Sequence, residues 1–405
     1  MTMRLPVLGR WVRLFAFGML AALPLSVAAV NVFGSLVVVT ALLSQEWWKA
    51  VRVVLQQPLA WVVLIMLFLL GAGMLYTVDS GYEAASTVAR YRKLLFILLL
   101  PPFFQENRDR LRALQVLAVS ICFTALLSWT EFFGWTHVSD PVYGGPPGDA
   151  VFKMHIPQGT LFSLLVVLGL CLAWDAWRES RWRAAAWGLM ALLAAGDIAW
   201  VMAGRTGKAI LPVIVIWAIW EMAYQTPVRK NFRRLLLAGS VLLVVGVTAA
   251  IWLNPHTTLG SISSEIRQSR ETGAATSQGM RLAFYRKAMQ LMAQRPWFGY
   301  GTGSVKVATQ ELAAGGSTEV DRLATVNVHN EFLMWAVQWG WPGLSCILLF
   351  FFYLWQASYR LPRVIGRCLR GQWVVFVAGC LFNSYLLDFA EGYALVLNAG
   401  ILLPL

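Results

Sequence analysis

A histidine and two glycines in one apolar segment form the first pattern in this sequence that could do chemistry. His329 and Asn330 open the segment, and Gly340 and Gly343 follow on the same helical face. A neutral imidazole, with an ordinary pKa of about 6.5, can take a proton from an attacking hydroxyl. We therefore interpret His329 as a candidate general base, with a purely structural histidine as the alternative. The glycines would let a neighbouring helix approach closely.

Two arginines could bind an anion. Arg281 falls in the first turn of a helix predicted for residues 280–292, where a cation opposes the helix dipole unless an anion binds the arginine and the free backbone amides. Arg205 lies at the predicted outer end of another helix, where it does not help to orient the chain in a membrane. Because guanidinium groups bind phosphate oxygens bidentately, these arginines predict a diphosphate site. The alternative for Arg281 is a side chain that points into solvent.

A histidine base and diphosphate-binding arginines suit the transfer of a sugar chain from a lipid-linked diphosphate to a hydroxyl. The arginines would stabilise the charge that the leaving diphosphate gains, and this chemistry needs no cofactor. The sequence contains no Asp-x-Asp, so we expect no metal. The glycine run of residues 299–303 lacks a βαβ unit, and residues 204–208 are too short for a P-loop, so neither predicts a nucleotide site.

The composition places these residues in a membrane protein. Of the 405 residues, 58% are apolar and 13% are charged, whereas a soluble domain carries about 25% charged residues. The net charge of +13 comes from basic residues in short clusters between apolar stretches, which indicates membrane topology and not nucleic-acid binding. The five cysteines show no CxxC spacing and predict neither a disulfide framework nor a zinc site.

Candidate membrane spans occur about twelve times. With the N-terminus inside, most basic clusters fall on the cytoplasmic side and all four histidines fall outside. A cleaved signal peptide is the alternative for the first segment. The predicted segments are residues 11–27, 30–44, 59–77, 92–104, 112–133, 157–175, 184–203, 209–225, 235–253, 329–358, 372–387 and 391–404.

We expect the chain to have three parts. Residues 1–254 would contain transmembrane helices 1–9, residues 255–327 a large periplasmic loop, and residues 328–405 transmembrane helices 10–12. The loop helix of residues 280–292 has an apolar stripe that includes Tyr285 and Met289, with Lys287 facing away. Such an amphipathic helix could lie on the membrane surface.

The sequence resembles the bacterial O-antigen ligases, within the O-antigen ligase and polymerase superfamily. His329 to Gly343 match the motif H-N-x9-G-x-x-G of that family. Arg281-Leu282, followed by residues 295–301, matches its loop segment, and residues 204–207 match its short arginine motif. The series of spans, with one large outer loop before the histidine helix, agrees with the family over essentially the whole chain.

This resemblance implies an all-α polytopic membrane protein of the GT-C-like glycosyltransferase kind. It implies metal-independent, inverting transfer of O-antigen from undecaprenyl diphosphate to the lipid A-core oligosaccharide, at the periplasmic face of the bacterial inner membrane. Carried over by position, His329 would be the general base, and Arg205 and Arg281 would bind the diphosphate. Asn330 would orient the histidine or a substrate.

Three further residues are suggested as substrate contacts by their place alone. Arg92 and Lys93 lie at a predicted outer helix end, and Asp388 precedes the final predicted helix. Asp388 has a cap of that helix as its alternative role.

Other functions stay open. Relatives that polymerise O-antigen repeats and relatives that glycosylate proteins (protein O-oligosaccharyltransferases) carry the same motif. Protein-glycosylating relatives generally have a long soluble C-terminal extension, whereas this sequence ends in an apolar segment. A secondary transporter is the alternative of another class. It would predict an internal repeat, which we do not find, and charges near the membrane midplane, where Asp197 is the clear acidic candidate.

Overall fold

Helices make up the regular structure of the part of the chain that is described. The computed structural model describes residues 7–139, 146–225 and 260–405, and between the last two ranges residues 231, 234–235, 238–242, 245–246 and 249. All regular elements within these residues are helical. The helices are α1 (Val7–Ala22), α2 (Val27–Leu43), α3 (Gln45–Val54), α4 (Pro58–Gly73), α5 (Tyr82–Tyr91), α6 (Leu95–Leu99), α7 (Asn107–Phe132), α8 (His155–Ala176), α9 (Arg181–Gly196), α10 (Arg205–Gln225), α12 (Ser261–Thr272), α13 (Ser277–Gln294), α14 (Val305–Ala314), α15 (Glu331–Ser358), α16 (Arg363–Cys380) and α17 (Phe389–Leu402).

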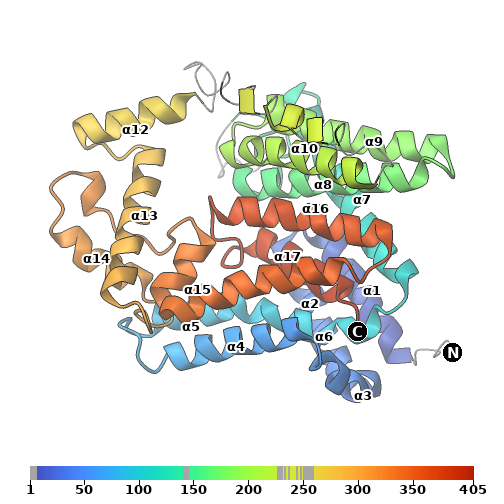
Figure 1. The fold of residues 1–405 in the computed structure, drawn as a ribbon, viewed down its shortest axis with the longest axis horizontal. Helices are drawn as coiled ribbons and strands as arrows, with labels where there is room; N and C mark the ends of the chain where they lie inside the picture. Colours follow the sequence, from blue (N-terminus) through green and yellow to red (C-terminus); the bar gives the residue numbers. More distant parts are fainter. Residues whose placement is uncertain are drawn as a thin grey trace.

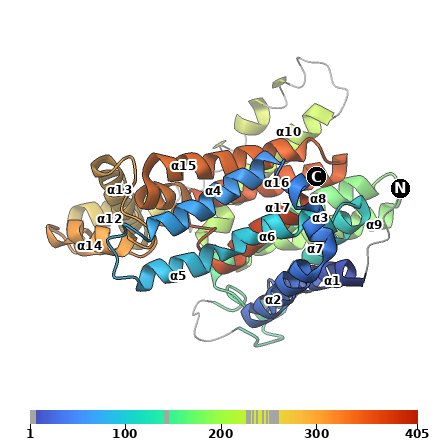
Figure 2. The same cartoon turned by 90° about the horizontal axis from the view of Figure 1, so that it is seen from below.

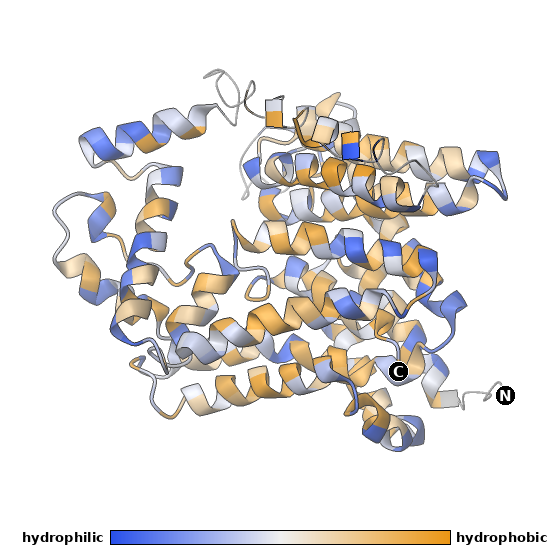
Figure 3. Cartoon of the chain, in the orientation of Figure 1, coloured by the Kyte–Doolittle hydropathy of each residue, from blue (hydrophilic) through white to orange (hydrophobic). Residues whose placement is uncertain are grey.

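The long helices lie side by side in one bundle, and a smaller group lies beyond one end of it. This group consists of α12, α13 and α14, which come from the predicted outer loop (Figure 1; Figure 2). Apolar residues cover much of the bundle, whereas α12 to α14 are richer in hydrophilic residues (Figure 3). An apolar bundle suits a lipid environment, and an appended polar group suits an aqueous one.

The bundle contains helices that can cross a membrane. Five described helices are long and apolar enough, and α2 with α3, bent by 89° at their junction, adds a sixth if the pair is one span. The helices α4 and α17 are apolar but shorter. The predicted all-α polytopic membrane fold is therefore confirmed. The five long candidates are α7, α8, α9 with the π-turn that follows it (together Arg181–Val201), α10 and α15.

Two predicted segments differ from the structure. Residues 92–104 form η1 (Arg92–Leu94), α6 and η2 (Pro101–Phe103) and not one helix. Helix α6 ends shortly before Pro101 and Pro102, which lack the amide hydrogens that a continuous helix needs. The segment of residues 372–387 belongs to α16, which ends at Cys380 and leaves Asn383 in a turn. The predicted segment of residues 235–253 lies largely outside the described residues.

A glycine and a proline break α15, as the sequence predicts. Gly340 has φ 62° and ψ −149°, a conformation that side chains rarely adopt. The backbone N–H of Trp341 donates to the carbonyl of Pro296, 2.7 Å away, instead of to its own helix. A Cβ at Gly340 would lie 2.3 Å from that carbonyl oxygen. The partner that approaches Gly340 is thus the turn after α13, and the prediction of a neighbouring helix is wrong at this position.

The break in α15 frees two carbonyl groups that hold the turn in place. The carbonyl of Val337 accepts from the N–H of Tyr300 at 3.0 Å, and the carbonyl of Gln338 accepts from the N–H of Gly301 at 2.9 Å. In a regular helix, these carbonyls would accept from residues 341 and 342, but Trp341 donates to Pro296 and Pro342 has no N–H to donate. The break therefore fixes the end of α13 against α15, and the two motifs form one structural unit.

Helix α13 buries a different face from the one predicted. Lys287, expected to face away, is buried, and its Nζ donates to the carbonyls of Asp321 at 2.6 Å and Leu323 at 2.7 Å. Met289, expected on the buried stripe, is 54% exposed. The buried face packs on α15 and α14. Internal carbonyl acceptors satisfy the lysine, so α13 is a packed part of the appended group and its buried face does not lie on a membrane surface.

Candidate active site

His329 adopts a strained backbone conformation directly before α15. Its φ is 58°, and it is the one non-glycine residue with positive φ in the part of the chain that the structure describes. Such a conformation costs about 1–3 kcal/mol and persists only where the surroundings hold it. The side chain of Asn327 accepts from the His329 N–H at 2.8 Å, and Asn330 begins the helix as its N-cap. These contacts fix the backbone of His329 and therefore the position of its imidazole.

A hydrogen-bond chain runs from the imidazole of His329 to a carboxylate. Nδ1 of His329 lies 2.9 Å from Oδ1 of Asn383, and Nδ2 of Asn383 donates to Oδ2 of Asp388 at 2.5 Å. Because the amide of Asn383 donates to the carboxylate, its oxygen faces the imidazole, and this oxygen can only accept. Nδ1 therefore carries the hydrogen, and Nε2 keeps the free lone pair of a base.

The surroundings of the imidazole favour its neutral form. Burial lowers the pKa of His329 below its ordinary value, the hydrogen bond with Asn383 opposes this, and the Arg281 cation lowers the pKa further. The ring of Phe284 lies parallel to the imidazole at a centroid distance of 6.5 Å and covers one side of it. A neutral imidazole at neutral pH is the form that can accept a proton.

Asn330 and Tyr285 hold the turn that carries His329. Oδ1 of Asn330 accepts from the N–H of Leu333 at 3.0 Å, and its Nδ2 donates to the carbonyl of Leu381 at 3.1 Å. The hydroxyl of Tyr285 lies 2.8 Å from the carbonyl of His329 and 3.0 Å from that of Leu381. Tyr285 thus faces the site and not a membrane surface. Asn330 therefore has the geometry of a helix cap directly after the histidine.

Arg205 opens α10 and meets a carboxylate from α12. Its Nη1 donates to Oε2 of Glu265 at 3.1 Å, and its Nη2 donates to Oε1 of the same carboxylate. Nη2 also donates to the hydroxyl of Ser261 at 3.1 Å. Both residues of the pair are about three-quarters buried at their side chains, with exposed fractions of 23% and 22%. The guanidinium is held in a bidentate geometry in the first turn of a helix, where anions are favoured.

Arg281 lies close enough to both Arg205 and His329 for its charge to affect them. Burial lowers the pKa of Arg281 and Tyr285 opposes this, while the neighbouring Arg205 lowers it further. The Arg281 cation in turn acts on His329. Arg281 is partly buried, so the alternative of a side chain directed into solvent does not hold. The structure thus brings the three residues together from α10, α13 and the start of α15.

Of the three weaker candidates, two join this site. Nζ of Lys93 donates to the backbone carbonyl of Asp388 and lies 5.5 Å from the ring centroid of Tyr393. Asp388 is the N-cap residue of α17, as its alternative role predicts, but its side chain makes no capping hydrogen bond. Its carboxylate serves Asn383 instead. Arg92 is exposed and hydrogen-bonds Tyr393.

Sequence reasoning missed two residues that position the site. Asn383 lies in a segment predicted to be a span, and the adjoining polar pair of residues 383–384 was the available signal. Glu331 is buried and accepts from the hydroxyl of Tyr91 at 3.0 Å, from Nε1 of Trp335 at 2.8 Å and from the N–H of Leu386 at 2.8 Å. It ties α5, α15 and the turn after α16 together, directly beside the histidine motif.

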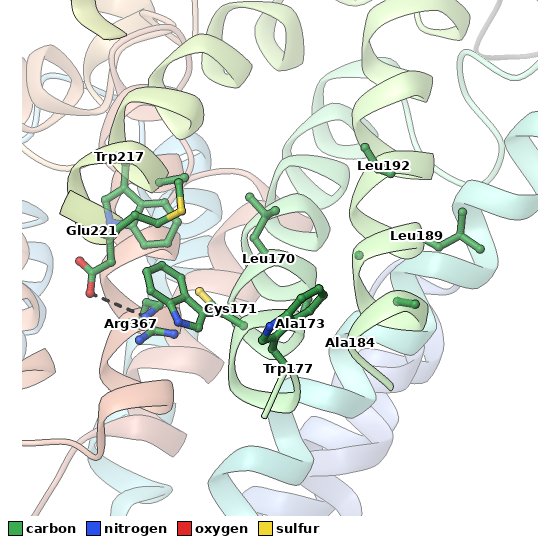
Figure 4. A pocket seen from close by; sticks show the side chains of 15 residues that line it. Leu170, Cys171, Ala173, Trp177, Ala184, Leu189, Leu192, Trp217, Glu221 and Arg367 are labelled. Atoms are coloured by element: carbon green, nitrogen blue, oxygen red, sulfur yellow. Dashed lines mark ion pairs between the residues drawn. The ribbon is translucent and has the colours of Figure 1, made fainter. Parts of the chain in front are cut away.

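A large apolar groove lies at the other end of the bundle helices. It measures about 840 Å³ and lies between the C-terminal halves of α8 and α10, with α9 and the start of α16 (Figure 4). Exposed leucines of α9 line it, and Glu221 and Arg367 form an ion pair of 3.9 Å at its edge (Figure 4). Since Arg205 begins α10, the groove is separate from the site around His329.

Within the described ranges, three or more His, Cys, Asp or Glu side chains do not gather into a set that could hold a metal ion. Metal independence itself stays a prediction.

The fold and the site together define a class of protein. The chain is an all-helical, multi-pass membrane protein with a polar site, built around a histidine and two arginines, where the bundle meets α12 to α14.

Residues 198–348 match the family model described as O-antigen ligase. This part of the chain is therefore similar to the O-antigen ligase superfamily, and the similarity supports a function of the ligase or polymerase type. The matched residues include Arg205, Arg281 and His329. No curated protein matches the chain.

Proposed function

We propose that this protein transfers O-antigen polysaccharide from undecaprenyl diphosphate to the lipid A-core oligosaccharide, at the periplasmic face of the inner membrane. The family match supports the reaction class. The observation that carries the proposal is the hydrogen bond between Nδ1 of His329 and Oδ1 of Asn383, at 2.9 Å, with Arg281 nearby. It leaves Nε2 as a base beside a cation, which is what attack by a hydroxyl on a sugar diphosphate needs.

In the proposed reaction, Nε2 of His329 removes the proton from an acceptor hydroxyl as its oxygen attacks the anomeric carbon. The bond between that carbon and the diphosphate oxygen breaks, and its electron pair leaves with the diphosphate. Attack opposite to the leaving group inverts the anomeric centre. Asn383 holds the imidazole in the required tautomer throughout, since its oxygen accepts from Nδ1–H.

Arg205 and Arg281 would bind the diphosphate and stabilise the charge that it gains. Guanidinium groups are suited to this task because each presents a planar fork of donors to phosphate oxygens. Two permanent cations in a partly buried site supply the stabilisation that a metal ion supplies in other enzymes. The mechanism is therefore proposed to need neither a metal nor a cofactor. Activity retained in a metal chelator is the expected result, and loss that Mg²⁺ restores would contradict it.

The transmembrane parts of the chain and its large loop would have separate roles. The helices of residues 1–254 and 328–405 would hold the polyprenyl tail of the donor in lipid, and residues 255–327 would form the periplasmic part that supplies Arg281.

An assay with purified components tests the proposal. The protein is supplied with O-antigen linked to undecaprenyl diphosphate and with lipid A-core oligosaccharide. We expect a shift of lipid A-core to ligated product without growth of the donor-linked chain. Longer donor-linked polymer would show a polymerase instead, and transfer to a protein acceptor alone would show a protein glycosyltransferase.

A further inference from the structure

An internal carboxylate pairs with the arginine that the proposed function assigns to the diphosphate. Both oxygens of Glu265 are used: Oε1 and Oε2 each accept from Arg205, and Oε2 also accepts from the N–H of Gln278 at 3.3 Å. Gln278 is the second residue of α13, so its N–H is one of the free donors at a helix N-terminus. A guanidinium fork and a free helical N–H are the groups that bind phosphate oxygens elsewhere.

Glu265 is ionised and faces both arginines. The hydrogen bond from Arg205 holds the pKa of Glu265 below its usual range, against the effect of burial, and the Arg281 cation acts in the same direction. One carboxylate therefore offers one negative charge to two cations that repel each other. A ligand that carries two negative charges matches the two cations better than Glu265 does.

The helix that carries Glu265, α12, buries little of its surface against the rest of the protein. Within α12 only Ser269 is buried. The helix ends at Gly273, whose φ of 71° favours glycine, and Gly260 precedes its first residue. The hydroxyl of Thr276 donates to the backbone carbonyl of Glu265 at 2.9 Å. Since so little apolar surface anchors α12, the carboxylate can leave Arg205 at a small cost in burial.

We propose that Glu265 is a specificity-determining residue of the donor site: its carboxylate excludes the singly charged phosphodiester headgroups of membrane lipids from Arg205 and yields to a doubly charged diphosphate ester. The inference rests on the proposed function of this site. The physical need is clear, because the site meets a bilayer in which phospholipid headgroups far outnumber the donor. A competing internal group builds selectivity against the wrong ligand at some cost in affinity for the right one.

The test measures binding of a polyprenyl diphosphate to the purified full chain in lipid nanodiscs, made either of phosphatidylcholine or with added phosphatidylglycerol. For the wild type, we expect phosphatidylglycerol to change the affinity less than about threefold. For Glu265→Gln, we expect about tenfold tighter binding in phosphatidylcholine and about tenfold weakening by phosphatidylglycerol. Glu271→Gln is the matched control, because it removes the same charge from the exposed side of α12, where Glu271 pairs with Arg267.

The outcomes separate this inference from the proposed function. If Glu265→Gln and Glu265→Ala bind no tighter than the wild type, or remain insensitive to phosphatidylglycerol, the selectivity role is wrong. If Glu271→Gln behaves like Glu265→Gln, the effect is one of general surface charge and the role is again wrong. If the wild type binds the diphosphate and Arg205→Ala does not, the donor site stands whatever the Glu265 variants do. Wild-type binding that Arg205→Ala leaves intact would overturn both.

Discussion

Asn383 accepts a hydrogen bond from Nδ1 of His329 at 2.9 Å and donates one to Asp388 at 2.5 Å. The hydrogen bond between His329 and Asn383 joins the start of α15 to the turn after α16, two segments that are distant in sequence. It fixes which nitrogen of the imidazole is free. A buried asparagine in this place sets the tautomer without adding a negative charge, so the imidazole stays neutral at neutral pH.

Replacing Asn383 tests this relationship through the pH profile. Asn383→Asp would place a carboxylate on Nδ1 and stabilise the charged imidazole, so the acidic limb of kcat/KM should move to higher pH. Asn383→Leu should lower kcat by about ten- to a hundredfold, because the tautomer is no longer fixed. Asn107→Asp, at the exposed start of α7, is the charge-matched control. An unmoved acidic limb in Asn383→Asp would contradict the positioning role.

The wild type should itself show a defined pH dependence. Burial holds the pKa of His329 below its ordinary value of about 6.5. The base is active when neutral, so activity should be constant around pH 7 and fall as the pH is lowered through that depressed pKa. The measurement is kcat/KM for the donor between pH 5 and pH 8. A limb with its midpoint above the ordinary histidine value would show that the imidazole is stabilised in its charged form.

Lysine should not replace either arginine. Arg205→Lys and Arg281→Lys keep the charge but lose the planar fork, so each should lower kcat/KM by roughly ten- to a hundredfold. Arg286→Lys, on the exposed side of α13, serves as the control. Full activity in both lysine variants would mean that bidentate contacts with the diphosphate are not used.

The break in α15 makes a prediction about stability. Gly340→Ala forces a Cβ to within 2.3 Å of the Pro296 carbonyl at a φ of 62°, and should destabilise the protein by about 2–4 kcal/mol. Gly188→Ala, in α9, is the control, since nothing lies within 4 Å of a Cβ there and alanine favours a helix. Thermal unfolding in detergent measures both. If Gly340→Ala unfolded at the same midpoint temperature as the wild type, the close packing of the turn after α13 on Gly340 would be contradicted.

Much of the site was accessible from sequence because its key residues belong to short motifs. His329 could be found as a scarce residue at the start of an apolar segment, and the break at Gly340 follows from the glycine and proline themselves. The all-helical membrane fold follows from composition and from the length of the apolar runs. These features are local in the chain, so a sequence pattern records them.

The remaining features depend on contacts between distant segments. The face of α13 was predicted wrongly because Lys287 finds two backbone carbonyls that no periodicity reveals. Asn383 lies among apolar residues, and its partner is 54 positions away. The pairing of Arg205 with Glu265 joins α10 to α12 and requires the folded arrangement. Sequence therefore predicted the candidate reacting groups, and the structure shows which residues contact them.

The central claim is that His329 is the base of a transfer reaction, and one comparison tests it most directly. His329→Ala is assayed for ligation and, in the same preparation, for binding of the lipid-linked donor. We expect ligation to be abolished while the protein remains folded and binds the donor, because the arginines that hold the diphosphate are unchanged. Substantial residual transfer by this variant would contradict the claim.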